Sequence, residues 1–134
     1  MFPKPVLLAE DNADDTALFQ RLYEQARIAN PLRIFDDGEG LLNYLVSDRL
    51  NFPLPAMVFL DLKMRRISGL EVLKFLGTKF KREFPAIILT GMEDLAQMRL
   101  AYELGAHSFL LKPLGTENFI AFMEKFKGIG VAKA

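Results

Sequence analysis

The segment VFLDLKMRRISGLEVL, residues 58–73, contains an apolar run, a carboxylate, a cationic loop and a helical pattern, in that order. The run Val58–Leu60 is apolar at every position, which is typical of a strand that is covered on both faces. Asp61 ends this run, and three cations follow it within five residues. A buried strand needs neither feature, so the end of this strand is a candidate functional position.

The same alternation of apolar runs and helical patterns continues along the chain. The apolar runs predict strands at Val6–Ala9, Leu32–Phe35, Ala56–Leu60, Ala86–Leu89 and Ser108–Leu111. Apolar residues at helical spacing predict helices at Ala17–Ile28, Gly40–Val46, Gly69–Phe80, Leu95–Leu104 and Glu117–Phe126. Five strand–helix units predict an α/β fold, a flavodoxin-like (βα)5 three-layer sandwich whose parallel strands take the order 2-1-3-4-5.

Length and composition restrict the class of protein. The chain has 134 residues, of which 51% are hydrophobic, so we expect a single domain over residues 1–134. It carries 17 basic and 17 acidic residues, and this balance gives no general attraction to nucleic acid or to an anionic membrane. The absence of cysteine excludes disulfides and thiolate metal sites. We find no signal peptide and no membrane-spanning run, and therefore expect a cytoplasmic protein.

Four of the five predicted strands end in a charged or hydroxyl side chain. Glu10 and Asp11 follow the first strand, Asp61 the third, Thr90 the fourth and Lys112 the fifth. In a parallel sheet of this order, ligands bind beyond the carboxyl ends of the strands, where strands 1 and 3 are neighbours. We therefore expect these five side chains to form one site.

The chemistry of this set points to a metal ion and a phosphoryl group. Two carboxylates about 4 Å apart repel each other by roughly 4 kcal/mol at an effective dielectric constant near 20, so either a proton or a cation must accompany them. Oxygen ligands without histidine or cysteine favour Mg²⁺. A carboxylate can accept a phosphoryl group, while a cation, the Lys112 ammonium and the Thr90 hydroxyl neutralise its oxygens.

Each of these strand-end residues, considered by itself, could instead have a purely structural role. An aspartate after a strand commonly caps a helix, and the acidic run from Glu10 to Asp15 can simply favour a helix N-terminus. Two related chemistries fit less well. A flavodoxin needs a phosphate loop rich in glycine and hydroxyls, whereas the loop here is AEDNADD, residues 9–15. A dehalogenase-type phosphohydrolase needs a second acid two residues after its nucleophile, where this chain has Lys63.

Five segments resemble the CheY-like receiver domain of bacterial response regulators, which act in two-component systems. They are VFLDLKMRRISGLEVL together with VLLAEDNADD (6–15), DDGEGLLNYL (36–45), IILTG (87–91) and FLLKPL (109–114). The resemblance covers about residues 5–127. It implies a single-domain response regulator in which Asp61 accepts a phosphoryl group from a sensor histidine kinase or phosphotransfer protein.

The resemblance also implies a Mg²⁺ or Mn²⁺ site. Glu10, Asp11 and Asp61 would hold the ion through their carboxylates, and Lys63 through its backbone carbonyl. Glu10 stands where many members of the family have aspartate, and its longer side chain could reach the ion through water.

Further residues receive roles from the same resemblance. Thr90 and Lys112 would contact the phosphoryl group, and the Lys112–Pro113 peptide bond would be cis. Thr90 and Phe109 would form the switch that reshapes the surface of the fourth helix, fifth strand and fifth helix. That surface would bind a downstream protein target or a second copy of the chain.

The chain departs from the family pattern close to the acceptor. Arg65 stands where the family usually has proline, and Ser68 where it often has aspartate. Lys63 and Met92 lie two residues after Asp61 and Thr90, at positions that tune hydrolysis of the phosphoryl group. Neither side chain can orient an attacking water as an acid, amide or base, so we predict slow autodephosphorylation.

The last helical segment, Asn118–Lys127, carries more apolar bulk than one buried stripe requires. The surplus is either a docking face or a thick core-facing helix. Two other functions also stay open. One is a pseudo-receiver that binds partners without phosphorylation, and the other is a Mg²⁺-dependent phosphohydrolase.

Overall fold

A computed structural model of the chain describes residues 4–47, 54–80, 83–91, 95–128 and 130–132. Its strands are Val6–Ala9 (β1), Leu32–Phe35 (β2), Met57–Asp61 (β3), Ala86–Thr90 (β4) and Ser108–Leu111 (β5). Its helices are Ala13–Gln25 (α1), Gly38–Ser47 (α2), Gly69–Phe80 (α3), Leu95–Glu103 (α4) and Thr116–Glu124 (α5). The strands form one parallel sheet in the order β2-β1-β3-β4-β5, which confirms the predicted topology.

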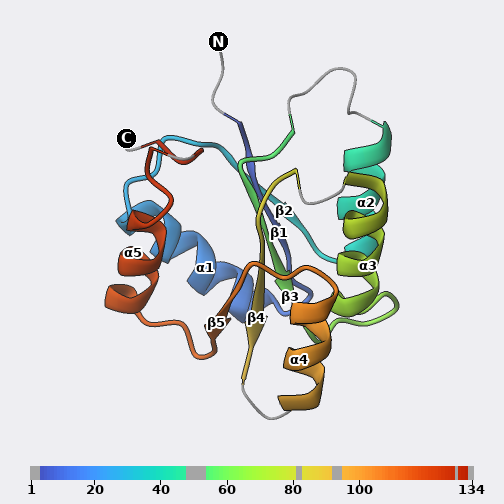
Figure 1. Ribbon diagram of the computed structural model, residues 1–134. Coiled ribbons are helices and arrows are strands. Elements are labelled where there is room, and N and C mark those ends of the chain that lie inside the picture. The colour runs from blue at the N-terminus through green and yellow to red at the C-terminus, as the bar shows by residue number, and fades with distance from the viewer. Residues whose placement is uncertain (1–3, 48–53, 81–82, 92–94, 129, 133–134) are drawn as a thin grey trace.

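Helices cover both faces of the sheet (Figure 1). One core cluster joins α1 and α5 to one face, with Phe19, Phe59 and Phe119 at its centre. A second cluster joins α2, α3 and α4 to the opposite face and includes Leu41 and Leu76. The architecture is therefore the predicted three-layer sandwich.

Burial of the strands follows their place in the sheet. Every residue of β1, β3 and β4 is buried, whereas the edge strands β2 and β5 are only partly covered. This explains why the inner strands are apolar at nearly every position, while β2 includes the exposed Arg33. The site therefore rests on the best-packed part of the molecule.

The ends of several elements differ from the prediction in ways that matter for the site. Helix α1 begins at Ala13 rather than Ala17, because the Asn12 side chain accepts a hydrogen bond from the backbone N–H of Asp15 and caps the helix. The helix ends early, at Gln25, and Arg27 follows in the left-handed region with φ 53°. Strand β3 continues through Asp61 itself, so the acceptor candidate is part of the sheet.

The apolar surplus of the last helix belongs to the core. Phe119, Phe122 and Met123 are buried in α5, and Ile120 and Phe126 pack against the same cluster. Of the two alternatives left open by the sequence, these contacts support the thick core-facing helix. Exposed apolar side chains occur instead on α4 and β5, where Leu95 is 70% and Leu111 46% exposed.

Among the described residues, no helix combines the length and the apolar character needed to cross a membrane.

Candidate functional site

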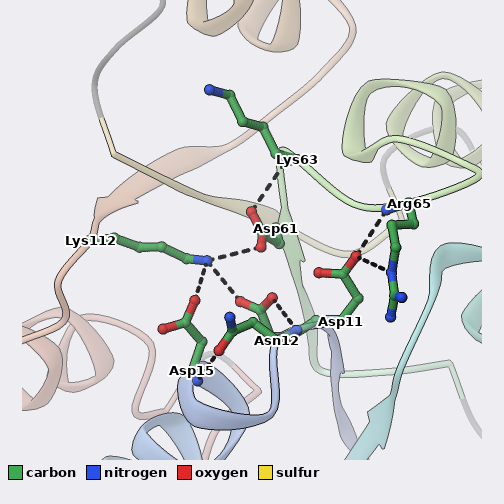
Figure 2. Close-up of polar contacts among 8 residues, drawn as sticks. Asp11, Asn12, Asp15, Asp61, Lys63, Arg65 and Lys112 are labelled. Atoms are coloured by element: carbon green, nitrogen blue, oxygen red, sulfur yellow. Dashed lines mark hydrogen bonds and ion pairs between the residues drawn. The ribbon is translucent and has the colours of Figure 1, made fainter.

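The carboxyl ends of β1, β3 and β5 bring a lysine and several carboxylates together (Figure 2). The Nζ atom of Lys112 donates hydrogen bonds to Glu10 Oε1 at 2.8 Å, Asp61 Oδ2 at 2.9 Å and Asp15 Oδ2 at 3.0 Å. Glu10 and Asp61 are almost fully buried, with 1% and 9% of their side chains exposed. A single ammonium therefore contacts three carboxylates that come from separate segments of the chain.

Glu10 lies in the least hydrated part of this cluster. Burial, followed by its proximity to Asp61, raises the pKa of Glu10 to about 7, while Lys112 acts in the opposite direction. Both carboxylate oxygens have hydrogen-bond partners, because the second accepts the backbone N–H of Asn12 at 3.1 Å. The repulsion between the clustered carboxylates is thus reduced partly by the Lys112 ammonium and partly by a proton on Glu10.

Lys112 stays charged in these surroundings. Burial by itself lowers the pKa of Lys112, but hydrogen bonds to Glu10, Asp61 and Asp15 outweigh burial and move it above the ordinary lysine value. The Lys112–Pro113 peptide bond is cis, as the family resemblance implied. The backbone N–H of Lys112 donates to Thr90 O at 2.8 Å, which ties the end of β5 to that of β4.

Asp61 is held in place by the loop that follows it. Its Oδ1 accepts the backbone N–H of Lys63 at 3.1 Å, while its Oδ2 faces Lys112. The Lys63 side chain is exposed and extends away from the carboxylates (Figure 2). The backbone of Lys63, rather than its charge, contacts the acceptor candidate.

Asp11 is connected to the same loop, but by Arg65. Asp11 Oδ2 accepts the backbone N–H of Arg65 at 2.9 Å and the side-chain Nε–H at 3.4 Å. The Arg65 side chain is 85% exposed and that of Asp11 only 15%. The cation therefore lies at the rim of the site and covers one oxygen of Asp11.

Three carboxylates at this edge of the sheet lie close enough together to share a divalent cation. One oxygen each of Glu10, Asp11 and Asp61 lies within 4.8 Å of the others. The donor set consists of oxygen atoms, which Mg²⁺ and Mn²⁺ prefer. The residues therefore fit the ion that the sequence predicted.

The predicted switch residues lie beside this cluster on neighbouring strands. Thr90 is the last residue of β4 and is buried, and Phe109 pairs with Ile88 in the β4–β5 ladder. Phe109 is half-buried and packs against the core cluster on the α2–α3–α4 face. Met92, the second position expected to tune hydrolysis, lies outside the described residues.

Two contacts of the site were not predicted from the sequence. Asp15 was assigned only to an acidic helix start, yet its carboxylate accepts a hydrogen bond from Lys112. Its position in the first turn of α1, directed by the Asn12 cap, was the available signal. The pairing of Arg65 with Asp11 joins residues 54 positions apart, and the sequence around either residue does not predict it.

Comparison with known proteins shows which family the chain belongs to. Residues 6–124 match the response regulator receiver domain, and this match includes every residue of the site. The chain belongs to the response regulator receiver domain family. Receiver domains are signalling domains that work with histidine kinases or phosphotransfer proteins and with downstream targets, and they bind Mg²⁺ or Mn²⁺ at an acidic pocket.

Two relatives are similar to this chain over most of its length. This receiver domain is 32% identical to the “Probable methanogenesis regulatory protein FilR2” of Methanothrix harundinacea, over 93% of this chain and 82% of the relative. It is 31% identical to response regulator Rcp1 of Synechocystis sp., over 91% of this chain and 85% of Rcp1.

Solved structures show the same likeness. The Mn²⁺-bound form of Rcp1 has a TM-score of 0.77 at 26% identity and covers 92% of this chain and 91% of its own. The bacteriophytochrome response regulator AtBRR has a TM-score of 0.78 at 32% identity, with 92% of each chain covered.

Proposed function

We propose that the protein is a single-domain response regulator in which Asp61 accepts a phosphoryl group from a sensor histidine kinase or a phosphotransfer protein. The observation that carries this proposal is the hydrogen bonding of Lys112 to Asp61 at 2.9 Å inside a cluster of buried carboxylates. Asp61 stands at the end of a fully buried strand, so its carboxylate is presented in one position. The family gives the reaction, and we infer its cytoplasmic location on the same basis.

A Mg²⁺ or Mn²⁺ ion would be held by the carboxylates of Glu10, Asp11 and Asp61, whose oxygens lie close enough to share it. The backbone carbonyl of Lys63 would complete the protein ligands. The bound ion supplies positive charge that neutralises phosphoryl oxygens. The Mn²⁺-bound structure of the relative Rcp1 supports this assignment.

Each side chain of the site would have a separate role in phosphoryl transfer. An Asp61 oxygen attacks phosphorus, a P–O bond forms, and the bond from phosphorus to the donor nitrogen breaks. Lys112 stays protonated and moves from its carboxylate partners toward the new phosphoryl oxygens, because their charge of about −1.5 to −2 is the stronger attraction. The Thr90 hydroxyl then donates a hydrogen bond to a phosphoryl oxygen.

The switch would use packing rather than a hydrogen bond. As Thr90 moves toward the phosphoryl group, it vacates space that the half-buried ring of Phe109 can enter. Phenylalanine has no hydroxyl, so its two positions differ only in the apolar surface that they bury. This movement would alter the α4–β5 surface.

The α4–β5 surface is also the proposed contact for a downstream protein, or for a second copy of the chain. Leu95 and Tyr102 are 70% and 66% exposed, and they lie two helical turns apart on the same side of α4. Arg99 and Glu103 lie beside Leu95 around a shallow hollow. Exposed apolar side chains ringed by charge are typical of a protein contact.

Incubation with acetyl phosphate and Mg²⁺, followed by intact-mass measurement, tests the assignment of Asp61. The wild type should gain the mass of one phosphoryl group, and Asp61→Asn should not. Asp14→Asn is the matched control, because Asp14 is an exposed aspartate in the first turn of α1 and is not among the carboxylates that contact Lys112. It should be phosphorylated like the wild type.

Other results of this experiment favour the alternative functions. No mass gain in the wild type would indicate a pseudo-receiver that works without phosphorylation. Sustained hydrolysis of phosphomonoesters would indicate a phosphohydrolase.

A further inference from the structure

The loop between β3 and α3 places two donors of one residue on one carboxylate oxygen. Asp11 Oδ2 accepts both the backbone N–H of Arg65 at 2.9 Å and its Nε–H at 3.4 Å (Figure 2). A proline at position 65 could make neither bond, since it has no N–H and no guanidinium. Any residue except proline can make the backbone bond, whereas the second bond needs a donor side chain such as that of Arg65.

The Arg65 guanidinium and a divalent cation would both bind the Asp11 carboxylate, the guanidinium through Oδ2. Asp11 is one of the three residues whose carboxylate oxygens cluster within 4.8 Å. A bound cation of charge +2 withdraws electron density from Asp11 and repels the guanidinium beside it. Binding of the ion would thus weaken or break the Arg65 side-chain contact, while the backbone contact can persist.

Other cations of the loop do not share this position. Arg66 Nη1 approaches Asp37 Oδ2 at 3.8 Å, and Asp37 is not part of the carboxylate cluster. The Lys63 side chain extends away from the carboxylates (Figure 2). Lys112 does contact the cluster, but it has an assigned role toward the phosphoryl group.

We propose that Arg65 sets the divalent-cation affinity of this receiver domain by competing for Asp11. This inference depends on the divalent-cation site of the proposed function, but not on the phosphorylation of Asp61. The competitor is weak, because the Arg65 side chain is 85% exposed and water screens it. Arg65 therefore reduces the affinity of the site without closing it, and the ionic strength of the solution changes how strongly it competes.

Direct titration with Mn²⁺ tests the proposal without any phosphoryl donor. The electron paramagnetic resonance signal of free Mn²⁺ reports the dissociation constant for the wild type, Arg65→Gln, Arg66→Gln and Asp11→Asn, at low and at high ionic strength. We expect Arg65→Gln to lower the dissociation constant by about two- to fivefold at low ionic strength, and by less at high ionic strength. Arg66→Gln removes the same charge from the same loop and should leave the constant nearly unchanged.

Each contrary result has a separate meaning. Equal tightening in both arginine variants would show a general charge effect and overturn the role of Arg65. An unchanged or weaker constant in Arg65→Gln would also overturn it. If the wild type binds Mn²⁺ and Asp11→Asn binds it more weakly, the proposed metal site stands even when Arg65 fails. Absence of binding in all four proteins would overturn the metal site and the inference together.

Discussion

At the scale of single residues, Glu10 connects the protonation of the site to the stability of the fold. Its side chain is 1% exposed and lies between Lys112 and Asn12. A carboxyl group so placed either stays protonated or depends on its cation. The folded protein therefore holds a proton on Glu10 at pH values where the unfolded chain has already released it.

We predict that Glu10 makes stability fall as pH rises toward neutrality. The Glu10 pKa is raised from 4.5 to about 7, so between these values the folded state binds more protons than the unfolded state. The associated loss of unfolding free energy is on the order of 3 kcal/mol and is complete above the folded-state pKa. Urea unfolding from pH 4 to pH 8 with a chelator present, compared between wild type and Glu10→Gln, measures it.

In Glu10→Gln this part of the pH dependence should disappear, because the amide side chain does not titrate. Asp14→Asn removes an exposed carboxylate and should keep the pH slope of the wild type. Identical slopes in wild type and Glu10→Gln would contradict the raised pKa of Glu10.

Lys63 gives a second prediction at this scale, on the lifetime of the signal. Its side chain is exposed, extends away from Asp61 and carries no amide or carboxylate that could orient an attacking water. Lys63→Asn offers an amide that can orient the attacking water. We expect phosphoryl loss to accelerate on the order of tenfold, less than a full general base supplies. Phosphorylated protein is followed by intact mass after the donor is removed, and equally fast decay in both proteins would refute slow autodephosphorylation.

At the scale of elements, the junction from β3 to α3 controls the position of Asp61. Gly69 begins α3 and donates its N–H to Leu62 O at 3.1 Å. A Cβ atom at Gly69 would lie 2.5 Å from Asp61 O and 2.9 Å from Leu62 Cα. Both atoms belong to the backbone, so a larger residue cannot be accommodated by rotating a side chain.

We therefore expect Gly69→Ala to destabilise the protein by about 1–3 kcal/mol, because it forces the end of β3 away from α3. Urea unfolding measures the loss, and the same shift should reduce phosphorylation by acetyl phosphate. Gly115→Ala is the control, since a Cβ there meets nothing within 4 Å and φ is −105°. Its loss should be smaller, and equal losses would refute the role of close packing at Gly69.

At the scale of the whole molecule, the sheet brings together residues that the sequence keeps far apart. Lys112 reaches Glu10 across 102 positions and Asp61 across 51. At the opposite end of the molecule, Asn30 Nδ2 donates to Lys4 O and Gly130 O, and so ties the chain near its start to the segment near its end. The contacts of Lys112 depend on the parallel strands, whose carboxyl ends meet at one edge of the sheet.

The proposed α4–β5 contact predicts a change in association. If a second copy docks on Leu95 and Tyr102, addition of beryllofluoride and Mg²⁺ should increase the molar mass measured by light scattering. Leu95→Glu should oppose the increase, and Val46→Glu, a change at an exposed apolar residue of α2, should not. A monomer in both conditions would remove the dimer and leave the downstream protein as the partner.

Much of this arrangement could be predicted from the order of residues along the chain. The five strands, their order and the gathering of Glu10, Asp61 and Lys112 follow from apolar runs that each end in a polar residue. Burial was harder to predict for residues whose surroundings come from distant parts of the chain. The apolar surplus of α5 could face either core or solvent, and only its packing against Phe59 and other core residues showed that it is buried.

The sequence alone thus predicted the fold and the place of the site, because strand periodicity and the residue after each strand are local properties, and five of its segments resembled the family. Tertiary structure decided how the charges are shared. Lys112 binds Asp15 as well as the predicted acids, Arg65 covers Asp11, and burial leaves Glu10 with a raised pKa. These outcomes depend on distances of about 3 Å between segments far apart in the chain and on the exclusion of water, neither of which is encoded in any single segment.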